Sequence, residues 1–193
     1  RRRSLKGILV PGAVVVEREL AAELGMSKTP VREALTQVCR EGLLRRLQGR
    51  GYMVSPVTLK EINDMYDMRL IFEEAAVRRF IASASEAEYE TLEEMARVKY
   101  VVDDPESYVV FLEANREFHL TLARAAGNDR LVQNLEAVMI EMERLFHLGL
   151  SIRDSSEEMM SEHQELLALL KEGALENALE CVQEQIAVSK KRI

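Results

Sequence analysis

The chain has 193 residues, of which 47% are hydrophobic and 31% charged, and its formal net charge is −7. It contains no apolar run of about eighteen residues, which excludes a membrane-spanning helix and predicts a soluble protein. Cys39 and Cys181 fall in different predicted domains and match no metal-ligand spacing, which favours reduced thiols in a cytoplasmic protein. The opening Arg-Arg-Arg-Ser lacks an initiator Met, so we expect the chain to begin inside a longer polypeptide.

The net charge conceals two halves of opposite sign. Residues 1–58 carry eleven Lys and Arg against five Asp and Glu, whereas residues 59–193 carry fifteen against twenty-eight. A basic segment attracts a phosphate backbone, and an acidic segment is repelled by it. We therefore expect the N-terminal part to face DNA and the C-terminal part to face away from it.

The first elements in the chain are expected to be short. Leu5–Pro11 is interpreted as the end of a truncated helix, and Pro11-Gly12 is a turn signal before the β-prone residues 13–16. Glu17–Leu44 then predicts two short helices joined by a tight turn. Gly25 follows the first helix, where a left-handed residue would end it, and Ser27 is a natural N-cap for the second.

The second of these helices has two distinct faces. Its apolar positions recur at helical spacing and predict a buried face of Val31, Ala34, Leu35 and Val38. Its outward residues are Thr29, Arg32, Thr36 and Arg40. Residues 43–47 and 52–55 then read as two strands around the turn at residues 48–51. A basic helix followed by a hairpin predicts a winged helix-turn-helix that fits a major groove.

The sequence here resembles the DNA-binding domain of GntR-family bacterial transcription regulators. The resemblance lies in Glu-Arg-Glu-Leu-Ala, Leu-Gly-Met-Ser-Lys-Thr-Pro-Val-Arg-Glu-Ala-Leu, Glu-Gly-Leu-Leu and Arg-Gly-Tyr-Met-Val, in fixed order. It implies a DNA-binding domain at residues 1–57 and operator contacts from Arg18, Ser27, Lys28, Thr29, Arg32, Arg50 and Gly51. Arg32 is the best candidate to read a guanine edge. The alternative, a helical hairpin whose charges are merely solvated, would not require these residues in this order.

Residues 58–193 predict an all-α bundle of six helices, so the chain as a whole is mainly α. Thr58-x-x-Glu61 is a capping-box pattern that opens a helix to about Ser83. The later starts are Ser85, Asp104-Pro105, Asn128, Asp154 or Ser155, and Ala174. The corresponding ends are expected near Val102, Gly127, Ile152, Gly173 and Lys191.

Polar residues interrupt the apolar stripes of four of these helices. When each helix is placed on a wheel, the polar residues at the stripe centres are Arg69 with Glu73, Asn115 with His119, His163, and Gln185. An unpaired buried charge would cost several kcal/mol, so we expect these groups to face one another. One explanation is an internal hydrogen-bond network, with Arg69 paired to Glu73 and each His bonded to a carbonyl. The other is a cavity that receives a ligand.

A second resemblance covers these positions. Arg69-x-x-Phe-Glu73, Asn115-x-x-Phe-His119 and Glu162-His163-x-x-Leu-Leu are similar to landmarks of the FCD effector domain in the FadR branch of GntR regulators. With six helices the domain is similar to the shorter, VanR-like version. The resemblance implies an effector site at Arg69, Asn115, His119, His163 and Gln185, with Arg69 pairing to a small organic acid.

Many such domains bind a divalent metal through an Asp, a His four residues later and two further His residues. The matching positions here are Asn115, His119, His163 and Gln185, so two ligands are replaced by amides. Amide oxygens suit Zn or Ni poorly, and His119 and His163 are left as the strong donors. We therefore expect metal binding to be weak or absent.

The leading functional hypothesis is a homodimeric, cytoplasmic transcription regulator that binds an operator and responds to a small acid. It is not expected to be an enzyme. A metal-dependent hydrolase built on His119 and His163 is the alternative, but Glu73 is the only carboxylate at the site centre and no His-Glu-x-x-His motif is present. A DNA-binding protein without effector would leave the buried polar residues unexplained.

Overall fold

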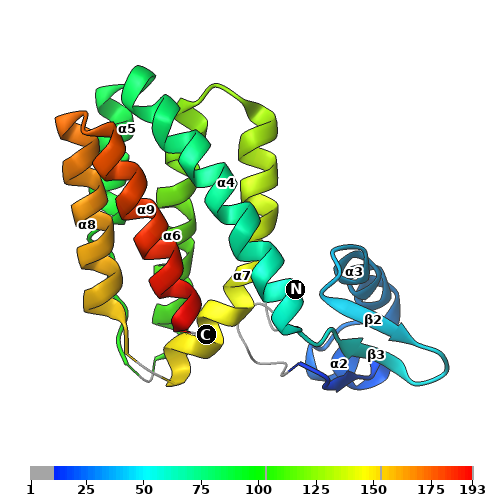
Figure 1. Cartoon of the computed structure of the whole chain (residues 1–193). Coiled ribbons are helices and arrows are strands. Elements are labelled where there is room, and N and C mark those ends of the chain that lie inside the picture. Colours follow the sequence, from blue (N-terminus) through cyan, green and yellow to red (C-terminus); the bar gives the residue numbers. More distant parts are fainter. Residues whose placement is uncertain (1–10, 103, 153, 193) are drawn as a thin grey trace. The chain divides into compact units, whose positions relative to one another are not determined.

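The structure is a computed structural model that describes residues 11–102, 104–152 and 154–192 (Figure 1). These residues form two compact units, which divide after Ile62. Of the expected helix end at Leu5–Pro11, residues 5–10 lie outside the described residues, and Pro11 belongs to a turn. The architecture is a small winged helix-turn-helix followed by an all-α bundle, which confirms the predicted fold class.

The N-terminal unit contains two helices and a small antiparallel sheet. Its elements are β1 (Val14–Val15), α2 (Glu17–Glu23), α3 (Lys28–Arg40), β2 (Leu44–Leu47) and β3 (Gly51–Val54). The strand order is β1-β3-β2, so the wing hairpin of β2 and β3 is extended by a strand that precedes the helices. Val14 pairs with Met53, and Arg46 pairs with Tyr52.

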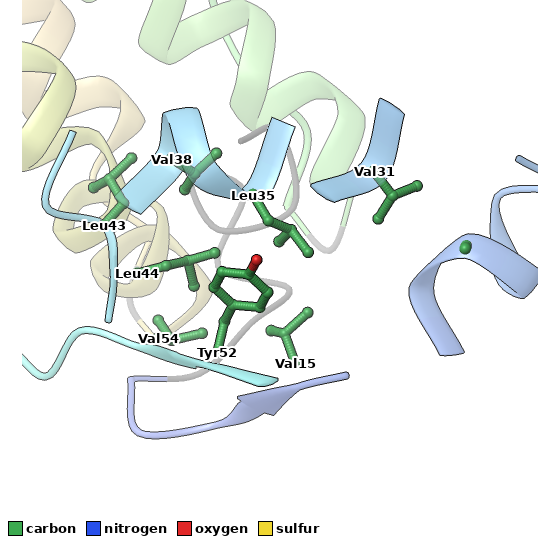
Figure 2. Packing of buried hydrophobic residues seen from close by; sticks show 9 residues of the cluster. Val15, Val31, Leu35, Val38, Leu43, Leu44, Tyr52 and Val54 are labelled. Atoms are coloured by element: carbon green, nitrogen blue, oxygen red, sulfur yellow. The ribbon is translucent and has the colours of Figure 1, made fainter. Parts of the chain in front are cut away.

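A single apolar core holds the recognition helix α3 against this sheet. Figure 2 shows the ring of Tyr52 between side chains of the helix and side chains of the strands. The helix contributes Val31, Leu35 and Val38 to this core, whereas Ala34 is exposed, so its expected place on the buried face is wrong. Ser27 occupies the N-cap position, but its side chain makes no capping hydrogen bond.

The helical bundle follows directly after the wing. Its helices are α4 (Leu59–Ser83), α5 (Glu86–Met95), α6 (Pro105–Ala125), α7 (Asp129–Ile152), α8 (Ser156–Glu172) and α9 (Leu175–Lys191). Four predicted capping groups are present: Thr58 and Ser85 form capping boxes, and Asp104 and Asn128 accept backbone hydrogen bonds. Ser155 occupies the N-cap position of α8, but its side chain makes no capping hydrogen bond. Among the described helices, none is both long and apolar enough to cross a bilayer.

The helix expected to reach Val102 ends at Met95 instead. The following residues include three β-branched valines, which have low helix propensity. In this connection Tyr100 is buried, where its ring lies edge-on to Tyr108 and Phe111. Its hydroxyl donates to Asp154 and accepts from the backbone N–H of Ser155. Burial of this one aromatic residue in a tertiary contact outweighs the continuation of the helix.

Gly51 permits the close approach of the wing to β1, and this generates a stability prediction. Its φ of +94° favours glycine, and a Cβ there would meet the backbone oxygen of Val15 closer than real Cβ atoms approach. Gly49, in the same hairpin, has φ +71° but open space around it. Gly49→Ala should cost about 1–2 kcal/mol for its left-handed backbone. Gly51→Ala should cost more, because β1 must also move.

Thermal unfolding of the full chain, followed by circular dichroism, measures both effects. Equal destabilisation by the two substitutions would contradict the role of the Val15 contact.

Candidate functional site

Three side chains from two helices form a buried charged cluster in the bundle. Arg69 and Glu73 lie one turn apart on α4, and His119 comes from α6; their exposed fractions are 5%, 1% and 2%. Arg69 Nε donates to Glu73 Oε1 at 2.5 Å, and Arg69 Nη2 lies 3.0 Å from His119 Nε2. The expected convergence of these residues is therefore present, and Arg69 is its centre.

The partners of His119 indicate which ring nitrogen carries its proton. A guanidinium carries only N–H donors, so His119 Nε2 must accept from Arg69 and the ring proton must reside on Nδ1. His119 Nδ1 lies 2.9 Å from Glu73 Oε2, which is ion-pairing distance, although the angle is not that of a hydrogen bond. The carboxylate of Glu73 thus contacts both Arg69 and His119, but His119 Nδ1 makes no hydrogen bond within the described residues.

His163 brings α8 to the same cluster. Its ring stacks on Phe118 with centroids 4.1 Å apart, and it meets the ring of His119 edge-on at 5.3 Å. Burial lowers the pKa of His163 well below its ordinary value of 6.5, and the positive charge of Arg69 lowers it further. His163 is therefore neutral at physiological pH.

Glu73 keeps its charge despite complete burial. Desolvation alone would raise its pKa, but Arg69 and then His119 outweigh that effect and lower the pKa to about 2. The cluster is thus a permanent cation, a permanent anion and two imidazoles inside an apolar bundle. Such a group stays stable only while its charges are paired.

The two amides expected at the site differ in placement. Asn115 is buried one turn before His119 on α6, and no hydrogen bond joins its side chain to another described residue. Gln185 is only half-buried, and its Nε2 donates to the carbonyl of Glu162 at 2.6 Å and to Cys181 Sγ at 3.0 Å. Its amide nitrogen is therefore engaged by residues of α8 and α9.

Two aromatic residues at the site were not among the predicted effector-site residues. Phe146 on α7 lies with its ring centroid 5.7 Å from Arg69 Cζ, which is a cation–π contact. Phe118 provides the surface on which His163 stacks. Their signal was ambiguous, because aromatic residues on an apolar stripe are also ordinary core residues. Phe118 is the Phe of the Asn115-x-x-Phe-His119 pattern, but nothing in the sequence of α7 distinguishes Phe146.

The residues present do not fit a tight metal site. His119 Nε2 already accepts from a guanidinium, which a bound cation would have to displace, and Glu73 is paired with the same Arg69. Within the residues that the structure describes, no group of three or more His, Cys, Asp or Glu side chains could hold a metal ion. The donor set that remains consists of two imidazoles and an amide.

The predicted DNA-contacting residues gather in the N-terminal unit. A cleft of about 480 Å³ lies between the start of α2, the start of α3 and the wing, and its basic lining residues are Arg18, Lys28, Arg32, Arg46 and Arg50. Gly51 also lines this cleft, whereas Ser27 and Thr29 are exposed outside its lining. Arg46 was missed, because strand alternation alone does not show which face of a two-stranded wing meets a helix.

Two family comparisons now apply. Residues 1–54 match the gntR family of bacterial regulatory proteins, and residues 64–187 match the FCD domain. The chain belongs to the GntR family and carries an FCD domain. Several curated relatives are longer proteins, and the chain spans about three fifths of their length, 58% in one case.

The chain is also similar to curated proteins and to a solved structure. The chain is 30% identical over 166 residues to an uncharacterized HTH-type transcriptional regulator of Streptomyces ambofaciens, covering 86% of this chain and 69% of that protein. It is 33% identical over 148 residues to the gluconate operon transcriptional repressor of Bacillus licheniformis, covering 72% and 58%. The structure of Escherichia coli McbR/YncC has a TM-score of 0.76 at 25% identity, covering 96% and 91%. The two curated relatives are named as a transcriptional regulator and a transcriptional repressor, in agreement with the expectation that the chain is not an enzyme.

The lowered pKa of His163 predicts a pH dependence of stability. The unfolded chain protonates this histidine near pH 6.5, whereas the folded chain does not. The contribution of His163 to the free energy of unfolding is therefore complete above pH 6.5 and is lost as pH falls. His163→Phe, which keeps a ring on Phe118, should remove a slope of up to about 1.4 kcal/mol per pH unit between about pH 6.5 and 5. Urea unfolding across this range measures it.

Glu73 affects stability at lower pH. Its contribution to the free energy of unfolding is complete above about pH 4.5 and is lost as the pH falls toward 2. Glu117, whose side chain is 40% exposed and pairs with Arg124, provides a control, since Glu117→Gln should leave the slope above pH 5 unchanged. An unaltered slope in His163→Phe would contradict the neutral buried histidine.

Proposed function

We propose that this GntR-family chain is a DNA-binding transcription regulator that acts in the cytoplasm and is controlled by a small organic acid. The observation that carries the proposal is the placement of two arginines, one in each unit. Arg32 lies in an exposed basic cleft of the winged-helix unit, and Arg69 is buried in the FCD unit. The first suits an operator and the second suits a carboxylate. We place the boundary between the two functions at residues 57 and 58.

Operator binding would use the cleft formed by α2, α3 and the wing. The start of α3 would enter the major groove, with Arg32 reading a base and Lys28, Arg18 and Arg50 contacting phosphates. Ser27, Thr29 and Gly51 would lie close to the backbone of the duplex. A two-fold homodimer would read two half-sites separated by about one helical turn or less.

Effector binding would use the unsatisfied part of the Arg69 guanidinium. Its Nε and Nη2 are engaged by Glu73 and His119, whereas Nη1 makes no hydrogen bond to another described residue. An acid could pair with Nη1 alone. It could also displace Glu73 and bind the guanidinium through two N–H groups. Asn115 and His163, both buried and without hydrogen bonds to other described residues, would complete the polar contacts.

The name of one relative supports a carboxylate effector. The repressor of Bacillus licheniformis is named for a gluconate operon, and gluconate is a carboxylate. Gln185 would join the site only if its bonds to Glu162 and Cys181 were exchanged. Zn or Ni, held by His119 and His163, would bind weakly, because Arg69 competes for His119.

The proposed roles of Arg32 as a base contact and Lys28 as a phosphate contact can be tested by two substitutions. Arg32→Ala should flatten the sequence preference at one base pair by about 1–3 kcal/mol. Lys28→Ala should weaken binding to all duplexes alike and make the salt dependence shallower, as expected for a phosphate contact. Selection from a randomised duplex library, with salt titrations on one fixed duplex, measures both. Equal loss of preference in the two variants would contradict the assignment.

The anchor role of Arg69 requires a charge-balanced variant. Arg69→Met alone would leave Glu73 buried without its partner, which typically costs about 3–5 kcal/mol and would obscure the result. The double variant Arg69→Met with Glu73→Gln removes both charges. A panel of short mono- and dicarboxylic acids that includes gluconate should raise the unfolding temperature of the unaltered chain by about 5 °C at saturation, and that of the double variant not at all.

The control for this experiment is Arg116→Met with Glu143→Gln, which removes an ion pair between α6 and α7 that lies outside the cluster. An acid that stabilises all three proteins equally would remove Arg69 from the effector site.

A further inference from the structure

The base-reading candidate Arg32 is already held by a carboxylate of its own domain. Arg32 Nε donates to Glu17 Oε2 at 3.0 Å, and Arg32 Nη2 donates to Glu17 Oε1 at 2.9 Å. This is a two-bond, planar arrangement between the first residue of α2 and the first turns of α3. The side chain of Arg32 is nevertheless 62% exposed, against 20% for Glu17.

The two bonds leave the end of the guanidinium available. Arginine has five N–H donors, and Glu17 occupies the one on Nε and one on Nη2. Both hydrogens of Nη1 and one of Nη2 remain. A guanine edge is read by two parallel N–H donors that reach O6 and N7. The Nη1 and Nη2 edge still offers such a pair, in a plane that Glu17 fixes.

Glu17 is also a negative charge among the basic residues that line the cleft. It is the only acidic residue among those that line the cleft of the N-terminal unit. The hydrogen bond from Arg32 lowers the pKa of Glu17, and the charges of Arg32, Lys28 and Arg46 act in the same direction against a smaller effect of burial. Glu17 therefore stays ionised, and its negative charge opposes the approach of phosphates.

We propose that Glu17 is a positioning residue that determines sequence specificity, because it fixes the Arg32 fork for one base at the expense of general DNA affinity. This inference rests on the proposed DNA binding. A flexible arginine could contact any phosphate or base acceptor within reach. An arginine whose Nε and Nη2 are bound by a carboxylate can offer only its Nη1 and Nη2 edge. The carboxylate thus restricts what Arg32 can bind.

This role predicts two effects of opposite sign. Glu17→Gln keeps the shape of the side chain but removes its charge and weakens its hold on Arg32. Binding to an unselected duplex should become up to about fivefold tighter, because one repulsive charge is removed. Discrimination at the base pair read by Arg32 should fall by about tenfold. A residue with a merely structural role would lower affinity and discrimination together.

The experiment uses the full chain and two DNA probes. A randomised duplex library, sequenced before and after selection, measures preference, and fluorescence anisotropy on one fixed unselected duplex measures general affinity. Glu19→Gln is the matched control, because Glu19 is an exposed acidic residue in the same turn of α2 and does not line the cleft. It should leave the preference unchanged. Glu17→Asp keeps the charge and should recover part of the discrimination.

The outcomes separate this inference from the function on which it rests. If the unaltered chain enriches no sequence, both are overturned. If it enriches a sequence and Glu17→Gln enriches the same one with equal discrimination, DNA binding stands and the role of Glu17 is overturned. Weaker binding of Glu17→Gln to both probes, with discrimination retained, also overturns it.

Discussion

Neutralising the buried charge of Arg69 is the constraint on which the bundle depends. A guanidinium and a carboxylate at this depth each need a partner, since an unpaired one would cost several kcal/mol. Glu73 supplies that partner from the same helix, and His119 extends the contact to α6. An acid that competes with Glu73 would therefore alter the link between α4 and α6. Because α4 begins at Leu59, five residues after the wing ends at Val54, such a change would act on the segment that joins the two units.

The same chemical arrangement occurs twice, with different burial. Arg32 and Arg69 each place two N–H groups against acceptors that include a carboxylate of their own unit. The Arg32 pair is largely in water, where exchange of an ion-pair partner costs little. The Arg69 pair is dry, where exchange is selective for a partner of equal charge. The guanidinium of Arg32 is suited to a surface ligand, and that of Arg69 to a ligand that enters the bundle.

The sequence was sufficient for most of the fold because its local signals agree with one another. Apolar periodicity, capping residues and the wing glycines all point to the same elements. Arg69, Glu73 and His119 could be predicted to meet, because each lies at the centre of an apolar stripe. The bond of Gln185 to the Glu162 carbonyl could not, because it depends on side-chain rotation in a half-buried position. Glu17 and Arg32 are fifteen residues apart, and their pairing depends on the packing of two helices.

The ring tautomer of His119 tests the central claim, that Arg69 occupies the position where a metal would compete. Nitrogen-15 NMR of the histidine rings distinguishes the two neutral tautomers. The account predicts a proton on Nδ1 and an accepting Nε2, with signals that do not change when Zn²⁺ is added in stoichiometric amounts. A proton on Nε2, or loss of the His119 and His163 signals into a tight zinc complex, would contradict it.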